Sequence, residues 1–152
     1  MNVAENIRDV FSILHDGIIA GFTIDDKLLV LRVECHYLAE LIDKSFDSFY
    51  VELNEIHVLS LLTWPNPFDS PVKIQKTPTD IFRAKLEILS VDIIDENVVI
   101  ACNQHDLDFA YCGGYLTLSC NSIRVYDHDK NELTIDHLDS ICNIYWNKGN
   151  IN

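Results

Sequence analysis

Two short stretches place a cysteine close to a histidine, a combination that can bind zinc or form a thiol–imidazole pair. Cys35 and His36 end the apolar run "LLVLRVECH", and Cys102 precedes His105 in "VVIACNQH". A zinc site needs four converging ligands, and a catalytic thiol needs a base within hydrogen-bond reach. Neighbouring residues of a strand point to opposite faces, so Cys35 and His36 cannot easily share one ion. We therefore favour a third interpretation, in which the two stretches are copies of one structural unit.

A second stretch resembles a calcium loop. In "DHDKN", Asp127, Asp129 and Asn131 match the first three ligand positions of an EF-hand. The loop then requires glycine, where this chain has Glu132, and later a bidentate glutamate, where it has Leu138. A turn explains the stretch better, and the sequence predicts no metal site and no cofactor.

A third stretch, "YCGGY", could present Cys112 as a nucleophile beside two glycines. No sequence window links Cys112 to a base, and a free thiol needs activation before it attacks. The simpler interpretation is that the glycines turn the chain into its next strand, so we predict that the protein is not an enzyme. The alternative is a small enzyme or ligand-binding β-barrel with a pocket lined by Cys112, His105 and Asp106.

The first half of the chain predicts one helix followed by three antiparallel strands. Apolar residues recur at helical spacing near the N-terminus, where Asn2 is a candidate cap. Alternating apolar and polar residues follow, and Asp25-Asp26 predicts a two-residue hairpin turn. The predicted helix covers residues 3–14, the predicted strands cover 18–24, 28–36 and 49–62, and a short helical turn near 38–42 separates the last two.

Prolines divide the chain into two halves. All four lie within residues 64–80, and proline fixes φ and supplies no ladder donor. We therefore predict an extended connector there that is neither helix nor central strand.

The second half repeats the pattern of the first. Residues 84–94 predict a strand, Asp95-Glu96 a turn and residues 97–105 the returning strand, at an offset of 69 from the first hairpin. The third strands align at an offset of 67, and each shifts its apolar phase by one residue at an asparagine, Asn54 or Asn121. A β-bulge produces such a shift.

These elements predict an α+β fold in one domain, residues 1–152. An internal repeat, 15–62 and 84–126, supplies two duplicated three-stranded meanders joined by the connector 64–80. The expected sheet is mostly antiparallel, as a sandwich or a partly closed barrel, with a short N-terminal helix and a C-terminal helix that Thr134 caps. Unpaired strand edges on such a sheet could support a homodimer.

Composition and cysteine usage predict a cytoplasmic protein. The N-terminus carries charges where a signal peptide needs an apolar run, and no stretch approaches the roughly 18 apolar residues of a membrane span. The five cysteines are odd in number and form no Cys-x-x-Cys pair, as is typical of thiols in a reducing compartment.

Charge is the least ordinary feature of the sequence. Twenty-four acids and eleven bases give a net charge of −13. Residues 86–147 hold eleven acids against Arg124 and Lys130, whereas residues 73–85 are basic. A negative field repels nucleic acid and anionic lipid and attracts basic proteins, so we expect acids to crowd one side and bind a basic protein. The predicted partner-binding residues are Asp92, Asp95, Glu96, Asp106, Asp108, Asp127, Asp129, Glu132, Asp136 and Asp139.

The opening of the chain resembles a known group of proteins. A short N-terminal helix is followed by "LHDGIIAGF", with His15, Asp16 and Gly17 at its start, and leads into an antiparallel sheet in a small acidic chain. This build is similar to immunity proteins of bacterial toxin-delivery systems, including contact-dependent inhibition. The resemblance implies that the chain binds and neutralises a cognate toxin domain, often a nuclease, by occluding it. It implies no catalytic residue.

Overall fold

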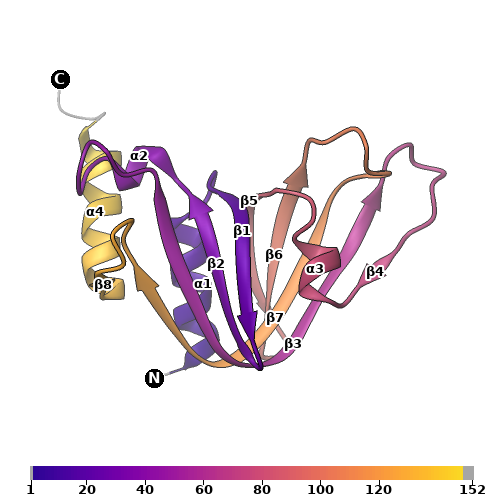
Figure 1. Ribbon diagram of the computed structural model, residues 1–152, viewed down its shortest axis with the longest axis horizontal. Helices are drawn as coiled ribbons and strands as arrows, with labels where there is room; N and C mark the ends of the chain where they lie inside the picture. Colours follow the sequence, from indigo (N-terminus) through magenta and orange to yellow (C-terminus); the bar gives the residue numbers. More distant parts are fainter. Residues whose placement is uncertain (1, 149–152) are drawn as a thin grey trace.

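The structure is a computed structural model that describes residues 2–148, and it shows an α+β fold around one eight-stranded antiparallel sheet (Figure 1). Two three-stranded meanders, β1–β2–β3 and β5–β6–β7, make up most of the sheet. The strands are β1 (Ile18–Asp25), β2 (Leu28–Glu34), β3 (Ser48–Pro65), β4 (Ile74–Gln75), β5 (Leu86–Ile94), β6 (Asn97–Gln104), β7 (Tyr111–Tyr126) and β8 (Glu132–Leu133). The helices are α1 (Val3–Ile13), α2 (His36–Ala39), α3 (Pro78–Ile81) and α4 (Ile135–Lys148).

The two long strands close the sheet into a partial ring. β3 pairs with β7 along nearly its whole length, from Tyr50 opposite Tyr126 to Pro65 opposite Tyr111. On the other side β1 meets β5 through a single short stretch that begins at Ile18. The predicted fold class is confirmed: an α+β protein with a mostly antiparallel, partly closed sheet and a helix near each end.

The two halves share one order of elements. In each half a helix precedes a hairpin, a long strand follows, and a two-residue strand then pairs with the far part of that long strand. Thus β3 has β2 and β4 along one side, and β7 has β6 and β8 along one side. An origin by duplication, with repeat limits at 15–62 and 84–126, stays a prediction.

Both long strands change phase where the sequence indicated. The predicted β-bulge forms only in β3, at the register shift between Ile56 and Val58, because the pairing runs from Ser122 to Cys120 of β7 without a shift. In β3 the buried series ends at Leu53 and the inward face resumes with the half-buried Ile56, and Glu55 between them has a φ of 56°. In β7 the buried series ends at Cys120 and resumes with the half-buried Ile123. The phase shift lets each strand serve both halves of the sheet, because its inward face changes along its length.

Helix α1 covers the core side of the sheet. The Asn2 side chain accepts a hydrogen bond from the Ala4 nitrogen at 2.9 Å, which confirms the predicted cap. Ile7, Val10 and Phe11 are buried against β5, β6, β7 and α4. Each such side chain contributes about 1.5–3 kcal/mol through burial.

Three of the predictions about turns and connections are wrong. Gly113 and Gly114 lie within β7, opposite Asn103 and Cys102, rather than in a turn before it. Asp25 pairs with Leu28, so the first hairpin loop is Asp26-Lys27, one residue later than predicted. The connector 64–80 is not uniformly extended, because it contains β4 and α3 and begins with the end of β3. Pro78 can begin α3 because the backbone N–H that proline lacks would have no partner within the helix at its first position.

Candidate binding surfaces

The structure separates the ten acids that were predicted to bind a partner. Asp92, Asp95 and Glu96 lie on β5 and its hairpin turn, and the turn borders the N-terminus of α1. Asp106 and Asp108 lie in the loop before β7. The remaining five lie beyond the other end of β7, and they are Asp127, Asp129, Glu132, Asp136 and Asp139. Because the 16 residues of β7 separate the last two groups at about 3.3 Å each, the ten acids do not crowd one side.

Asp127 is a structural residue rather than a contact for a partner. The residue is 5% exposed, and its Oδ1 accepts hydrogen bonds from the backbone nitrogens of Asp129 and Asn131, each at 2.9 Å. The Asn131 side-chain amide lies 3.5 Å from Oδ2. The carboxylate therefore holds the turn between β7 and β8, which corrects its assignment to the partner-binding set and confirms that "DHDKN" forms a turn.

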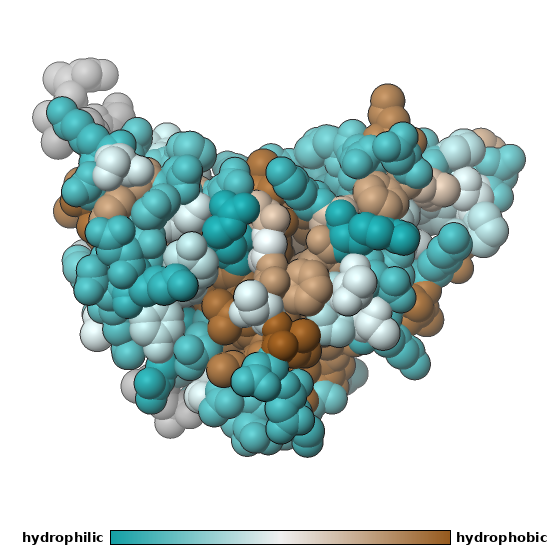
Figure 2. Space-filling model, in the orientation of Figure 1, coloured by the Kyte–Doolittle hydropathy of each residue, from teal (hydrophilic) through white to brown (hydrophobic). Residues whose placement is uncertain are grey.

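An acidic surface does form at one end of the molecule, from residues of both halves. The loop after α2 meets the turn after β7, where the His128 ring stacks on Phe46 with centroids 5.1 Å apart. His128 Nδ1 also lies 3.3 Å from both the backbone nitrogen and Oδ1 of Asp47. We call this surface the acidic end; it comprises Glu40, Asp43, Asp47, Asp129, Glu132, Asp136 and Asp139. Its cations are Lys44, Lys130 and Arg124, whose Nη1 lies 3.9 Å from Glu132 Oε1. It lies at the left of Figures 1 and 2, around α4, where hydrophilic residues dominate.

Hydrogen bonds keep two carboxylates of the acidic end ionised. The Asp43 carboxylate accepts from the Ser45 backbone nitrogen at 2.9 Å and from its hydroxyl at 2.7 Å, which lowers the pKa of Asp43. The Ser48 hydroxyl likewise lowers the pKa of Asp47, and His128 adds to this effect. Both side chains therefore stay negative at lower pH than an ordinary aspartate.

The alternative pocket near Cys112 is not formed as predicted. His105 and Asp106 border a hollow of about 320 Å³, where His105 Nε2 lies 3.2 Å from Glu87 Oε1. The exposed Cys112 is not among the residues that line this hollow, and its Sγ lies 3.7 Å from the Trp64 carbonyl oxygen. The thiol and the imidazole therefore do not share a site.

The two cysteine–histidine stretches also have structural roles. Cys35 lies just beyond β2, buried at the start of α2, and burial raises its pKa to about 11. Cys102 is fully buried in β6, where burial raises its pKa to about 12. Within residues 2–148, no group of three or more His, Cys, Asp or Glu side chains is arranged to hold a metal ion.

A large hollow lies on the outer face of the first meander, away from the core. It encloses about 610 Å³ and is bordered by β1, β2, β3 and the end of β7. Arg32 stands opposite Tyr50, and Tyr50 stands opposite Tyr126, so the three form one row across three strands. We call it the tyrosine hollow; it is lined by Gly21, Phe22, Thr23, Val30, Arg32, Tyr50, Glu52, Tyr126 and Lys130.

Sequence reasoning did not find the tyrosine hollow or the loop that contributes to the acidic end. Alternation along residues 28–36 could have placed Arg32 on the solvent face, beside Val30. The pairing of Tyr50 with Tyr126 had no such signal, because it arises from the closure of β3 on β7 between residues 76 positions apart in the chain.

Comparison of the chain with protein families, curated proteins and solved structures found no match in sequence or fold. In the part of the chain that the structure describes, no helix combines the length and the apolar character that crossing a membrane would require.

Proposed function

We propose that this chain is a non-catalytic binding module that captures and occludes a basic protein, as an immunity protein captures its toxin. The observation that carries the proposal is the joining of the loop after α2 to the turn after β7 through Phe46, Asp47 and His128. This contact gathers acids from two distant segments at the acidic end.

The charge of the acidic end suits fast capture of a cationic surface. Seven acids there face Lys44, Lys130 and Arg124, and Lys130 is partly withdrawn because its Nζ lies 5.1 Å from the centre of the Tyr50 ring. Concentrated charge of one sign raises association rates by about 10–10³-fold and makes them depend on ionic strength. A partner with a basic cleft, such as a nuclease, presents the complementary surface.

The first experiment identifies the partner by function. The reading frames that flank the gene in its native genome are expressed one at a time, with and without this chain, and cell growth is measured. We expect one flanking product to be toxic alone, basic in composition and harmless when this chain is present. If no flanking product is toxic, or if the toxic one is not neutralised, the immunity role is wrong.

The second experiment locates the contact on the purified complex. A variant that combines Asp43→Lys, Asp129→Lys and Asp139→Lys reverses exposed charges at the acidic end. A matched variant that combines Asp25→Lys, Asp92→Lys and Asp108→Lys changes the net charge equally at exposed positions elsewhere.

We expect the first variant to slow association by about 10–10³-fold in 50 mM NaCl and the matched variant to slow it by less than about tenfold. Association of the wild-type chain should also slow steeply between 50 and 500 mM NaCl. Equal effects of the two variants, or a rate insensitive to salt, would contradict the proposed contact surface.

A further inference from the structure

The tyrosine hollow holds a guanidinium edge that the fold leaves uncovered. Gly21 stands opposite Arg32 in the ladder between β1 and β2, next to a register shift in β1. A Cβ atom at Gly21 would lie 3.8 Å from Arg32 Nε and 4.0 Å from Nη2. A larger side chain there would lie against this edge, so glycine keeps the Nε–Nη2 side of the guanidinium open.

The remaining part of the guanidinium is anchored. Arg32 Nη1 donates to Glu34 Oε1 at 3.1 Å, two residues along the same strand. Arginine has five N–H donors, and the Nε–Nη2 pair forms a flat fork that matches the two oxygens of a carboxylate or phosphate. Glu34 therefore orients the group while the fork remains available to a ligand.

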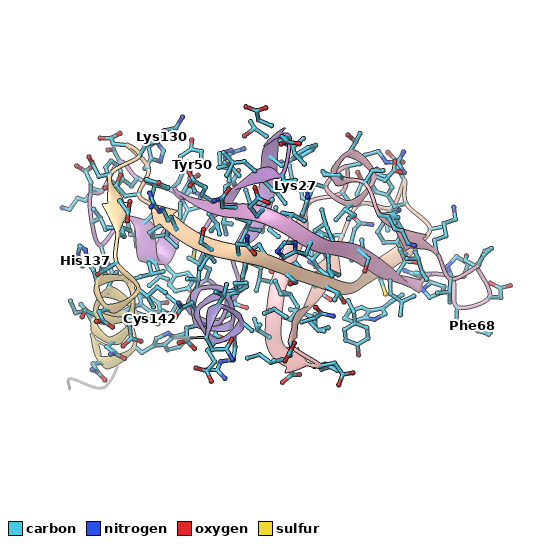
Figure 3. All side chains as sticks on the ribbon, turned by 90° about the horizontal axis from the view of Figure 1, so that it is seen from below. Lys27, Tyr50, Phe68, Lys130, His137 and Cys142 are labelled. Atoms are coloured by element: carbon cyan, nitrogen blue, oxygen red, sulfur yellow. The ribbon has the colours of Figure 1, made fainter. Side chains whose placement is uncertain are left out.

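Aromatic rings and a second cation lie beside this fork. Directly opposed residues on neighbouring strands have Cβ atoms about 4.5–5.5 Å apart, so Tyr50 adjoins Arg32 on one side and Tyr126 on the other. Lys130 lies over the Tyr50 ring, and Figure 3 shows both side chains on the same side of the long β3–β7 ribbon. Figure 2 shows apolar residues gathered over the middle of this face, around β1 and β2.

The second meander shows that the fold itself does not require this arrangement. The row Gly21–Arg32–Tyr50–Tyr126 has a counterpart in Ser90–Ala101–Tyr115–Leu62, which has the same pairing order across β5, β6, β7 and β3. A hollow of about 460 Å³ also lies there, next to Trp64, but alanine occupies the position of the arginine. The cationic fork belongs to one half alone.

We propose that the tyrosine hollow binds a small organic anion that carries a planar ring. Two oxygens of its carboxylate or phosphate group accept from the Nε–Nη2 fork of Arg32, Lys130 adds a second positive charge, and the ring packs on Tyr50 and Tyr126. The volume of the hollow lies within the range of about 300–1,000 Å³ that small-molecule sites occupy. This inference does not rest on the proposed capture of a basic protein.

The test uses the full chain and four probes: benzoate, phenyl phosphate, the neutral benzamide and the ringless acetate. Binding is followed by two-dimensional amide NMR and by calorimetry. We expect saturable millimolar binding of benzoate or phenyl phosphate, with the largest shifts at residues 21, 32, 50 and 126, and at least tenfold weaker binding of benzamide and acetate. The two anions distinguish a carboxylate ligand from a phosphate ligand.

Two variants and one control locate the contact. Arg32→Gln removes the fork. Gly21→Val covers it at a position where an added Cβ makes only ordinary van der Waals contacts and φ is not positive, so each variant should weaken binding at least tenfold. Arg8→Gln removes an arginine of α1 that does not line the hollow and should leave binding unchanged. Unaltered binding to both variants, equal binding of benzamide, or no saturable binding of any anion would each overturn the proposal.

Discussion

The Asp127 carboxylate sets the geometry of the turn that contributes Asp129 and Lys130 to the two binding surfaces. It is buried, and it accepts two backbone hydrogen bonds of 2.9 Å. Asp127→Ala leaves those donors without their acceptor, so we expect the free energy of unfolding to fall by about 1–3 kcal/mol. Asp129→Ala, which removes an exposed carboxylate, should change it by no more than about 0.5 kcal/mol. Urea titration measures both, and a neutral Asp127→Ala would show that the turn does not depend on the carboxylate.

The thiols differ in reactivity because burial differs. Burial raises the pKa of Cys35 and Cys120 to about 11 and that of Cys102 to about 12, whereas Cys112 is exposed. A thiolate is the reactive form, so a raised pKa suppresses alkylation at neutral pH and postpones it to higher pH. At pH 8 we expect iodoacetamide to modify Cys112 first, and at pH 10 Cys102 should still resist. Mass spectrometry of peptides measures the order, and labelling in urea is the control that makes all sites accessible.

Local periodicity predicted most elements, whereas contacts between distant segments were not predictable. The helix near the N-terminus and both hairpins appear close to their expected limits because their residues alternate or recur on one buried face. The phase shifts at Asn54 and Asn121 were also visible in the sequence. The acidic end was not, because it depends on Asp47 meeting His128 across 81 residues. The prediction of a single acidic face is wrong for the same reason. Acids that are near one another in the sequence lie at opposite ends of β7 in the structure.

The bulged start of β7 depends on a residue without a side chain. Gly113 has a φ of 151°, and a Cβ there would lie 2.0 Å from the Cys102 carbonyl oxygen and 2.9 Å from the Trp64 ring. We expect Gly113→Ala to destabilise the fold by about 1–3 kcal/mol through overpacking, with backbone strain adding to the loss. Gly21→Ala is the matched control, since its Cβ meets nothing closer than 3.8 Å. Thermal unfolding compares them, and equal stability of the two variants would contradict the close approach of β6 to β7.

The partly closed ring brings the ends of the two meanders together, and the folded chain must therefore keep acids from both ends close to one another. A net charge of −13 makes the compact state repel itself, and the acidic end concentrates that repulsion. Salt screens exposed charges over a Debye length of about 10 Å at 0.1 M. The protein should therefore be more stable in moderate NaCl than in its absence.

Neutralising acids at the acidic end should stabilise the fold in the same way as salt, because it removes the repulsion that salt screens. Glu40 and Asp139 are exposed residues of this surface, one at the end of α2 and the other within α4. We expect Glu40→Gln with Asp139→Asn to raise the melting temperature by a few degrees in 10 mM NaCl and to make no difference in 500 mM NaCl, measured by calorimetry. Asp25→Asn with Asp92→Asn is the control that removes the same amount of charge elsewhere, and it should give a smaller increase in melting temperature.

A gain in stability that coincides with slower capture of a basic partner would show that these carboxylates are retained for binding rather than for folding. A loss of stability would mean that they support the fold instead.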